Sequence, residues 1–544
     1  MAVATFAITN ARIFTGGPST PWAEAIASSA GRIVAVGKGR DVDSFIGPRT
    51  KVLDAQGRLV LAGFIDAHVH LIWGYEVGRW IDLADHPSLR EIQRRVSMEA
   101  EAYPTEEIIV GYGFDYTSLP TEGMPKRALD AAVADRPVLL LAYDGHTGWG
   151  NTRFTHRALS ATASVGSDAG EMQRDPRTGD PTGLFHRVFD LLPLLPEIRR
   201  RRSLAGLRRT VAMASHYGIT TAFDVQVELE DIGVYDELRR SGGLTVRIRA
   251  AIHHPKGTPR DRYPQFVTAR DRFQDDWYRV ASVKLYIDGI QETGTAALLE
   301  PYANNPSSRG ETVYSVEEYQ KIVAELSRLG FQVLTHACGD RGARIALDAY
   351  ERAGRLDGHA DRRHRVEHCE ILSGSDISRF TNLEVIPCMM PFHASPGLTS
   401  RWHQAMGRAR SSAAFPWRQL VDAGAAPSFA SDWPVAPLNP LLGIHEAISR
   451  TAADGGPSPH RLSLPEAIDC YTRRAAFATF AEATRGSLAV GKYADLIILS
   501  QNLFDIAPSK VPETRVLQTI VAGQVVYDAA LGDRKGNASP PSPE

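Results

Sequence analysis

Through the first sixty residues, hydrophobic and polar positions alternate with a period of two, and glycines separate the short runs. Such alternation is typical of strands with one buried face, and glycines between runs are typical of turns. The pattern predicts strands over 6–14, 25–28 and 32–36 and a hairpin over 51–61. The same pattern of short strand-like runs and turns occurs again only near the other end, over 486–499 and 516–527. We therefore predict one small β-sandwich domain assembled from both ends of the chain.

Between these ends, short apolar runs alternate with helical patterns, as expected of βα units around a parallel sheet. The apolar runs lie at 63–67, 219–224, 246–252, 281–286, 332–336, 365–368, 384–389 and 427–431. Eight such units are the number that closes a (β/α)8 barrel, the TIM barrel. The long segment 78–205 breaks this rhythm, so we predict an insert there, after the first barrel strand.

The predicted fold is α/β: a TIM barrel with a small β-sandwich and an insert. The expected parts are the N-terminal part of the sandwich at 1–62, the barrel at 63–480, the C-terminal part of the sandwich at 481–530 and a tail at 531–544. Gly, Ser and Pro are frequent near the end of that tail, and we expect it to be frayed.

Charge narrows the choice of partners. The 544 residues include 61 Lys and Arg against 63 Asp and Glu, a formal net charge of −2. This balance argues against nucleic acid or an anionic membrane surface as a partner. The only dense basic cluster is Arg199–Arg202, which we expect on a solvated helix face.

The sequence shows no pattern for membrane insertion or secretion. No stretch approaches about 18 uninterrupted apolar residues, and the first residues lack a basic region followed by a long apolar run. The cysteines are too few and too scattered for a disulfide framework; they are Cys338, Cys369, Cys388 and Cys470. We therefore expect a cytoplasmic protein with reduced cysteines.

Two histidines lie at the end of the first predicted barrel strand, in the segment Gly63-Phe-Ile-Asp-Ala-His-Val-His70. Side chains at i and i+2 of an extended segment point to the same side. At the carboxyl end of a barrel strand, His68 and His70 would present two imidazoles to one metal ion. A His-x-His pair alone is weak evidence, and the short apolar strand before it strengthens the prediction.

Four more polar residues lie on or just after later predicted strands. They are Lys284, His336, His368 and Asp432. Each alone is better explained as a buried histidine, a capping aspartate or a lysine whose amine reaches solvent. Their shared placement on barrel strands, after a His-x-His strand, is harder to explain separately. We expect them to complete the ligand set of one or two divalent cations.

With these residues the chain resembles the amidohydrolase superfamily of metal-dependent hydrolases. It is most similar to the amidohydrolase 3 branch, which includes the YtcJ-like proteins and N-substituted formamide deformylase. The segments that carry the resemblance are Gly63–His70, Val283–Gly289, His336–Asp340, Arg365–His368, Ser431–Val435 and Gly491–Leu496. The resemblance covers essentially the whole chain, and it specifies a family without specifying a substrate.

The resemblance implies a role for each candidate residue. His68, His70, His336 and His368 would be metal ligands, and Asp432 would be both ligand and general base. Lys284 matches the position where related enzymes carry a lysine carbamylated by CO2 that bridges two metals. The implied cofactor is Zn2+ or another divalent metal, with one or two ions. Whether Lys284 is carbamylated stays open.

Two segments bear on substrate binding. The family often has Gln-Pro followed by a histidine where this chain reads Met389-Met-Pro-Phe-His393, so His393 is an expected substrate contact while Met390 cannot supply an amide. The insert contains Asp144-Gly-His-Thr-Gly-Trp-Gly-Asn151, which resembles a His-x4-Asn pattern of the family. His146 is therefore a second expected contact, with a plain turn as the alternative.

The expected reaction is hydrolysis of a C–N amide bond in a small N-substituted substrate by metal-activated water. Aromatic residues on segments placed at the barrel mouth suggest an apolar wall that favours an aryl or alkyl substituent. These residues are Trp73, Tyr75, Tyr112, Phe114, Trp149, Phe392, Trp402 and Trp433. Trp433, next to Asp432, is the one we expect at the substrate.

Two other readings keep the fold and change the function. Members of the superfamily also catalyse decarboxylation, isomerisation and deamination with similar ligands, and some have lost metal ligands and act as scaffolds. Every expected ligand position is filled here, which disfavours a scaffold. The expected partner is a small-molecule substrate, and the resemblance is compatible with a homo-oligomer.

Overall fold

The structure, a computed structural model of the full chain, describes residues 3–17, 21–77, 80–85, 87–120, 124–164, 171–191, 195, 204–452 and 456–532. The chain divides into two compact units. The first comprises 1–71, 208–254 and 261–543, and the second comprises 72–207 and 255–260. The predicted basic helix face at Arg199–Arg202 lies outside the described residues.

The first unit contains a sheet of eight parallel strands, as the TIM-barrel prediction requires. In chain order these strands are β8 (Phe64–Val69), β15 (Ile219–Val227), β16 (Arg247–His253), β17 (Tyr278–Tyr286), β18 (Gln332–Ala337), β19 (Arg365–His368), β20 (Ile386–Met389) and β21 (Ser428–Phe429). Chain order is also the order in the sheet. The Asp432 N–H donates to the His68 carbonyl at 2.9 Å, which joins the last strand to the first. The prediction of a (β/α)8 barrel is confirmed.

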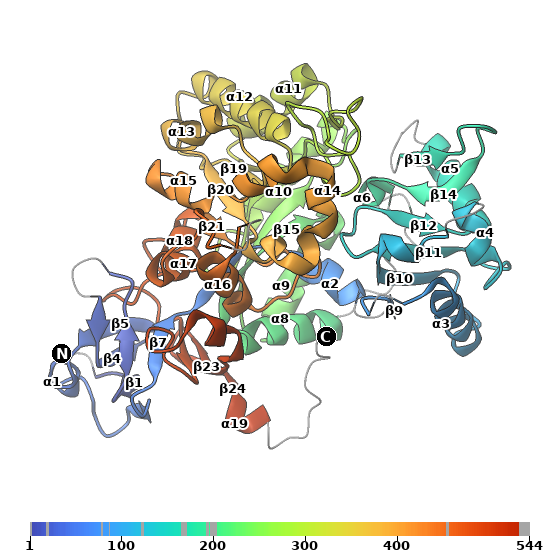
Figure 1. Cartoon of the computed structure of the whole chain (residues 1–544). Coiled ribbons are helices and arrows are strands. Elements are labelled where there is room, and N and C mark those ends of the chain that lie inside the picture. Colours follow the sequence, from blue (N-terminus) through green and yellow to red (C-terminus); the bar gives the residue numbers. More distant parts are fainter. Residues whose placement is uncertain are drawn as a thin grey trace. The chain divides into compact units, whose positions relative to one another are not determined.

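Helices surround these strands (Figure 1). They are α8 (Leu204–His216), α9 (Ile232–Arg240), α10 (Tyr263–Arg272), α11 (Val316–Arg328), α12 (Asp340–Leu356), α13 (Gly374–Asn382), α14 (Pro396–Ala413), α15 (Trp417–Asp422), α16 (Pro440–Ser449), α17 (Leu464–Cys470) and α18 (Arg473–Ala478). In α12 the buried residues Ala343, Ala346 and Leu347 recur at spacings of three and four, which gives the helix one apolar face. Such faces cover the sheet.

The inside of the barrel is packed with apolar side chains below the strand ends. Phe223, Val225, Ala251 and Leu334, from strands β15, β16 and β18, form one buried cluster. Gly63 precedes β8 where the chain passes very close to β15. A Cβ atom on Gly63 would lie 2.2 Å from Thr220 Cγ2, so only glycine fits at this approach.

Two further sheets of the first unit form the β domain, and both ends of the chain contribute to it. One sheet has the order β5-β4-β1-β6, and the other has the order β24-β23-β22-β7-β2-β3. Their bounds are β1 (Phe6–Thr9), β2 (Arg12–Phe14), β3 (Trp22–Ala23), β4 (Ala25–Ser29), β5 (Arg32–Gly37), β6 (Lys51–Asp54), β7 (Leu59–Ala62), β22 (Leu496–Leu499), β23 (Val516–Val521) and β24 (Gln524–Asp528). Ile8, Ile26, Val60, Leu496 and Ile520 share one core cluster. Figure 1 shows the N-terminal and C-terminal strands side by side.

Two local predictions in this domain are wrong. The single strand expected over 6–14 is two strands, because Asn10 adopts φ +51° between them and each strand belongs to a different sheet. The hairpin expected over 51–61 is also absent: β6 pairs in parallel with β1, and β7 pairs in parallel with β2. Alternation of hydrophobic and polar residues is the same whether a chain turns back or crosses to the opposite sheet, so the pattern could not distinguish the two.

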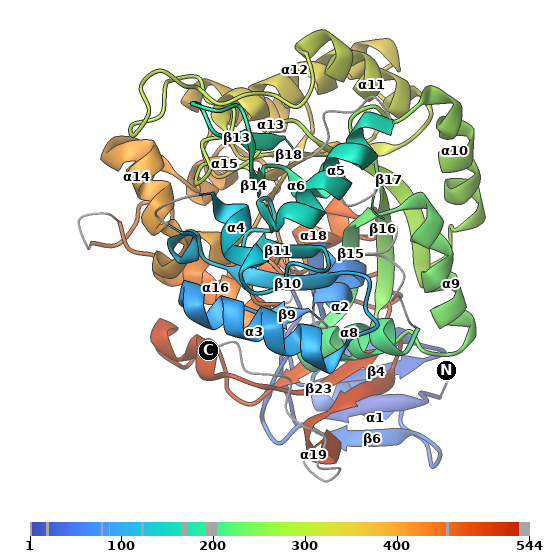
Figure 2. The same cartoon turned by 90° about the vertical axis from the view of Figure 1, so that its right-hand side faces the viewer.

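The second unit has its own mixed sheet, in the order β13-β14-β12-β11-β10-β9. The strands are β9 (Ile81–Asp82), β10 (Ile109–Phe114), β11 (Val138–Ala142), β12 (Gly148–Gly150), β13 (Met172–Arg174) and β14 (Pro181–Phe185), and the main helices are α3 (Leu89–Ala102), α4 (Pro125–Asp130) and α5 (Thr152–Ser164). Figure 2 shows β10 and β11 with α3 and α5 beside them. Phe114, Leu140 and Trp149 lie in the core of this unit.

Across the described ranges, every helix is too short or too polar to cross a lipid bilayer. The four cysteines are all buried, and none forms a disulfide.

Candidate metal centre

The first cluster of polar side chains joins the ends of β8 and β21, the first and last barrel strands. His68 and His70 lie at the end of β8, and Asp432 follows β21. The Oδ1 atom of Asp432 lies 3.2 Å from His68 Nε2 and 3.1 Å from His70 Nε2. All three side chains are buried. A carboxylate and two imidazoles thus converge as the ligands of one ion do.

Asp66 and Ser431 hold this junction together. The Ser431 hydroxyl donates to Asp66 Oδ2 at 2.5 Å, and the Ser431 N–H donates to Oδ1 at 3.1 Å. The His68 N–H donates to the same Oδ1 at 3.3 Å. Burial raises the pKa of Asp66 to about 6, although these hydrogen bonds oppose the rise. The network keeps the His68 and Asp432 backbones side by side.

His68 is oriented by a second carboxylate. Its Nδ1 atom lies 2.5 Å from Glu367 Oε2, and Arg365 donates to both oxygens of Glu367 at 2.8 and 2.7 Å. Burial alone would raise the pKa of Glu367, but Arg365 and His68 lower it well below its usual range. With its Nδ1–H directed to an ionised carboxylate, His68 turns Nε2 toward Asp432. This is the arrangement in which a carboxylate positions a metal-binding histidine.

His368 links the two halves of the cluster. It ends β19 with φ +72°, a backbone conformation uncommon outside glycine. Its ring centroid lies 5.2 Å from that of His68 and 4.3 Å from that of His336. Three groups of potential ligand atoms share His368: one with His68 and Asp432, one with His336 and Cys338, and one with Glu370 and His393. Within each group these atoms lie within 4.8 Å of one another.

Cys338 is a neighbour that the sequence interpretation missed. Its Sγ atom lies 3.5 Å from His336 Nε2, and that nitrogen also lies 3.1 Å from the Gly289 carbonyl oxygen. Burial raises the pKa of the Cys338 thiol well above its usual value, which favours the protonated form. The signal was present in the sequence, because Cys338 follows His336 by two positions, the spacing of the His-x-His pair.

Lys284 lies on β17 with its side chain fully buried. In the described part of the chain its Nζ atom has no hydrogen-bond partner, and it lies 4.8 Å from the centroid of the Tyr286 ring. Burial lowers the pKa of Lys284 to about 8, while the nearby carboxylates of Glu367 and Asp432 oppose the shift. A substantial fraction of this amine is therefore neutral near pH 8.

His393 approaches Asp432 from the segment after β20. Its Nε2 atom lies 3.6 Å from Asp432 Oδ2, and its Nδ1 atom lies 3.3 Å from Glu370 Oε1. The Trp402 indole N–H donates to the other oxygen of Glu370 at 2.9 Å. Glu370 therefore fixes the direction of the His393 ring. The sequence interpretation did not identify Glu370, and it placed Trp402 in a pocket wall, whereas Trp402 is buried with its indole used in this contact.

The remaining predicted substrate contacts lie in two places. Trp433 follows Asp432, is half-buried, and donates its backbone N–H to Ser431 Oγ at 3.0 Å. His146 belongs to the second unit, in the turn between β11 and β12, where its backbone N–H donates to Asp144 Oδ1 at 2.7 Å. The expected aromatic wall is reduced, because Phe114 and Trp149 are fully buried in the core of the second unit.

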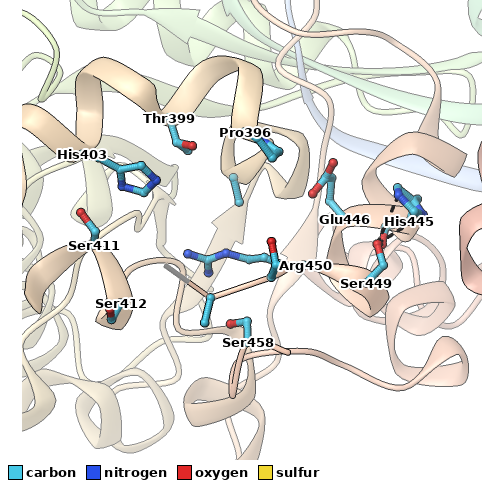
Figure 3. Close-up of a pocket in the computed structure, with 13 residues that line it drawn as sticks. Pro396, Thr399, His403, Ser411, Ser412, His445, Glu446, Ser449, Arg450 and Ser458 are labelled. Atoms are coloured by element: carbon cyan, nitrogen blue, oxygen red, sulfur yellow. Dashed lines mark hydrogen bonds between the residues drawn. The ribbon is translucent and has the colours of Figure 1, made fainter. Parts of the chain in front are cut away.

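A separate polar cavity of about 320 Å³ lies between α14 and the end of α16 (Figure 3). The side chains around it include Thr399, His403, Ser411, His445, Glu446 and Arg450. Of the described residues that line it, none belongs to the candidate metal centre. The histidine and aspartate cluster is therefore distinct from this cavity.

The chain is similar in sequence to several known proteins. The chain is 28% identical to Protein LONG AFTER FAR-RED 3 of Arabidopsis thaliana, over 96% of this chain and 92% of the relative. It is 28% identical to the putative amidohydrolase YtcJ of Bacillus subtilis, over 88% of this chain and 91% of the relative. It is 26% identical to N-substituted formamide deformylase of Arthrobacter pascens, over 96% of this chain and 98% of the relative.

Solved structures agree with the fold. A metal-dependent hydrolase of Pyrococcus horikoshii, itself uncharacterised, superposes with a TM-score of 0.72 at 22% identity, covering 93% of this chain and 99% of that one. Atrazine chlorohydrolase TrzN of Arthrobacter aurescens, solved with zinc, gives a TM-score of 0.55 at 16% identity, covering 96% and 95%. The profile of the amidohydrolase family matches residues 51–527. On that match the chain belongs to the amidohydrolase family.

Proposed function

We propose that this chain is a metal-dependent hydrolase that cleaves the C–N bond of a small N-substituted amide. The observation that carries the proposal is the convergence of His68, His70, His368 and Asp432 at the carboxyl ends of the barrel strands. Catalytic groups of TIM-barrel enzymes lie at this end. Family membership supports hydrolysis, and the relatives include a deformylase.

The residues fit a divalent metal on chemical grounds. Among the described side chains, His368 Nδ1, His393 Nε2 and Lys284 Nζ are buried polar atoms without a hydrogen-bond partner. Leaving such atoms unsatisfied is costly, and imidazole and carboxylate are the ligands that zinc prefers. His68, His70, His368 and Asp432 would hold one ion. His336 and Lys284 would help to hold a second.

Lys284 supports the two-metal version of the proposal. Its partly neutral amine can attack CO2, forming an N–C bond and releasing one proton, and the product is an anionic carbamate. The carbamate adds two oxygen ligands where the unmodified lysine has none. Its negative charge would also compensate a second cation in a buried place. We propose this modification as the reason for a lysine inside the barrel.

Asp432 is the proposed general base. When bound, a divalent ion lowers the pKa of water from about 15.7 to near 7 and polarises the carbonyl oxygen of the substrate. Burial alone would raise the pKa of Asp432, but His68, His70 and His368 lower it well below its usual range. An ionised carboxylate accepts the proton of the attacking water and can return it to the nitrogen of the leaving amine.

The substrate class rests on one relative and on two side chains near Asp432. We propose an N-substituted formamide or related N-acyl amine, because one relative that spans nearly the whole chain is N-substituted formamide deformylase. The half-buried Trp433 follows Asp432 directly and would contact the substituent. His393, held by Glu370, would contact the polar part of the substrate.

The first test is metal content together with turnover. Protein from zinc-supplemented cells, purified without chelator, is analysed by plasma mass spectrometry and assayed with N-formyl and N-acyl amines. We expect one or two equivalents of metal and turnover that chelator abolishes. In Lys284→Met a content near two should fall toward one.

Three outcomes would contradict parts of the proposal. A chain that takes up no zinc overturns the metal centre. A loaded chain that deaminates or decarboxylates but releases no amine from any amide overturns the reaction. Turnover limited to small polar amides, with no gain for N-aryl or N-alkyl substituents, overturns the substrate class. Each outcome is read from a separate measurement.

A further inference from the structure

Four arginines lie together at the other end of the barrel, where the strands begin. Arg247 and Arg249 are on the first part of β16, and Arg279 is near the start of β17. Arg485 comes from the segment between α18 and β22, which leads into the β domain. Arg247, Arg249 and Arg485 are all at most 5% exposed. Charged groups are rarely buried to this degree unless they are paired.

Arg247 has a complete set of partners. It donates to both carboxylate oxygens of Asp495 at 2.8 and 3.2 Å. Its guanidinium lies 4.7 Å from the Trp277 ring centroid and 4.1 Å from that of Tyr493. This bidentate pair uses the charge of Asp495 and leaves it unavailable to the other arginines.

Within the part of the chain that the structure describes, Arg485 contacts only one oxygen of one carboxylate, that of Asp276. Its Nη2 atom lies 3.2 Å from Asp276 Oδ1, while the other oxygen of Asp276 accepts from the Tyr493 hydroxyl. The Nε and Nη1 atoms of Arg485 are buried and have no partner within the described ranges. Two nitrogens of this guanidinium, which together carry three N–H donors, are therefore unsatisfied.

Arg249 has no carboxylate partner in the described part of the chain. Its Nη1 atom donates to the neighbouring Ile248 carbonyl at 3.0 Å, and its Nε atom is buried without a partner. The Nε atom of Arg279 is also buried without a partner among the described residues. Four guanidinium groups thus face two carboxylates, those of Asp276 and Asp495, which leaves two positive charges uncompensated.

Burial and the excess of positive charge lower the pKa values of Arg249 and Arg485. Burial lowers the pKa of Arg249 well below its usual value, and the charges of Arg485, Arg279 and Arg247 lower it further. Burial and Arg247 likewise lower the pKa of Arg485 to about 10. Uncompensated buried charge of one sign is strongly unfavourable, and a bound counter-ion is the direct remedy.

We propose that Arg249, Arg279 and Arg485 form a binding site for one small oxyanion such as phosphate or sulfate. The planar guanidinium fork suits two oxygens of such an anion, and Arg249 and Arg279 are paired neighbours on the parallel strands β16 and β17. Arg279 is only half-buried and Asp276 is 45% exposed, so the cluster has an edge that an ion can reach. The anion would join β16 and β17 to the segment 485–495 of the β domain and so stabilise their contact.

The test measures binding and stability in a buffer without oxyanions. Dialysed protein is titrated with inorganic phosphate and with sulfate by calorimetry, and its Tm is recorded with and without each anion. We expect one R249M-sensitive site per chain and a Tm rise of several degrees. In Arg249→Met that site and that rise should disappear, while Tm without oxyanion should equal or exceed that of the wild type.

Two controls separate this site from other effects. Arg272→Met removes one exposed positive charge on the neighbouring helix α10 and should keep the wild-type response. Phosphate held at a metal site would persist in Arg249→Met and is not counted. If Arg249→Met fails to fold, Arg249→Lys keeps the charge without the fork and should weaken binding at least tenfold. An equal response in wild type and Arg249 variants, or no anion binding by the wild type, would overturn the proposal.

Discussion

The two ends of the barrel bury polar groups of opposite kinds. At the carboxyl ends of the strands, His68, His368 and Asp432 offer lone pairs, which suit a cation. At the amino ends, Arg249 and Arg485 offer N–H donors, which suit an anion. In TIM barrels the carboxyl end carries the chemistry and the amino end carries stability. The comparison teaches that mutations in the histidine and aspartate cluster should lower turnover, whereas mutations in the arginine cluster should change stability.

The largest expected effect is at the carboxyl end. Asp432→Asn removes the proposed general base, and we expect kcat for an amide to fall by about 10³-fold or more. Stability should change little by comparison, and much of the metal should remain, because the histidine ligands are intact. Turnover and metal content are measured on the same preparation, with the exposed Asp422→Asn as the matched control. Undiminished turnover would remove Asp432 from the mechanism.

The paired arginine at the amino end should behave in the opposite way. Arg247→Met leaves the Asp495 carboxylate buried without its partner, and the free energy of unfolding should drop by about 3–5 kcal/mol. Metal content and kcat of the folded fraction should stay near wild type. Denaturant unfolding measures the loss. The double variant Arg247→Met, Asp495→Asn should cost less than the single one, and a larger cost would contradict the pairing argument.

For the metal-free protein, we expect the free energy of unfolding to depend on pH through Lys284. Its pKa is about 8 in the folded state against 10.5 for the ordinary amine, because of burial. Between these values the unfolded state binds more protons, so stability rises with pH through this window. Below about pH 8 the penalty for the buried charge is present in full, about 3 kcal/mol. Lys284→Met should flatten the rise, as measured by unfolding at pH 7.5 to 10.5.

The smallest effect is expected at Glu367, which contacts the proposed ligand His68 and would not bind the metal itself. Glu367→Gln weakens the orientation of His68, and we expect a 10–100-fold loss of metal affinity or activity. Competition with a fluorescent zinc chelator measures the affinity. The exposed Glu317→Gln is the control, since it removes one charge far from the centre. A loss confined to stability, with wild-type affinity, would show that Glu367 supports the fold and not the ligand.

The eight barrel strands were predictable because each is a short apolar run followed by helical periodicity. His68, His70, His336, His368 and Asp432 were identifiable because strand ends of a parallel barrel meet at one place, whatever their distance in sequence. The metal roles of these residues remain predictions. What the structure adds is their spacing around Asp432.

Other features could not be read from the pattern. The segments 6–14 and 51–61 each divide between two sheets, and alternation of polarity does not record which sheet a strand joins. Glu370 acts through His393, and its neighbour Trp402 comes from a later helix, so no local signal marks the contact. The arginine cluster likewise depends on Arg485 meeting β16 across more than 200 residues of chain.

Strand β22 lies between β7 and β23 in the six-stranded sheet, and Leu61 pairs with Ile497. More than 400 residues separate the two partners along the chain. At a synthesis rate of about 5–20 residues per second, the ribosome finishes β7 roughly 20 to 90 seconds before β22 emerges. Throughout that interval the nascent chain carries an apolar strand with an open hydrogen-bonding edge. The emergence of β22, and not completion of the barrel, therefore sets the moment at which this edge can be closed.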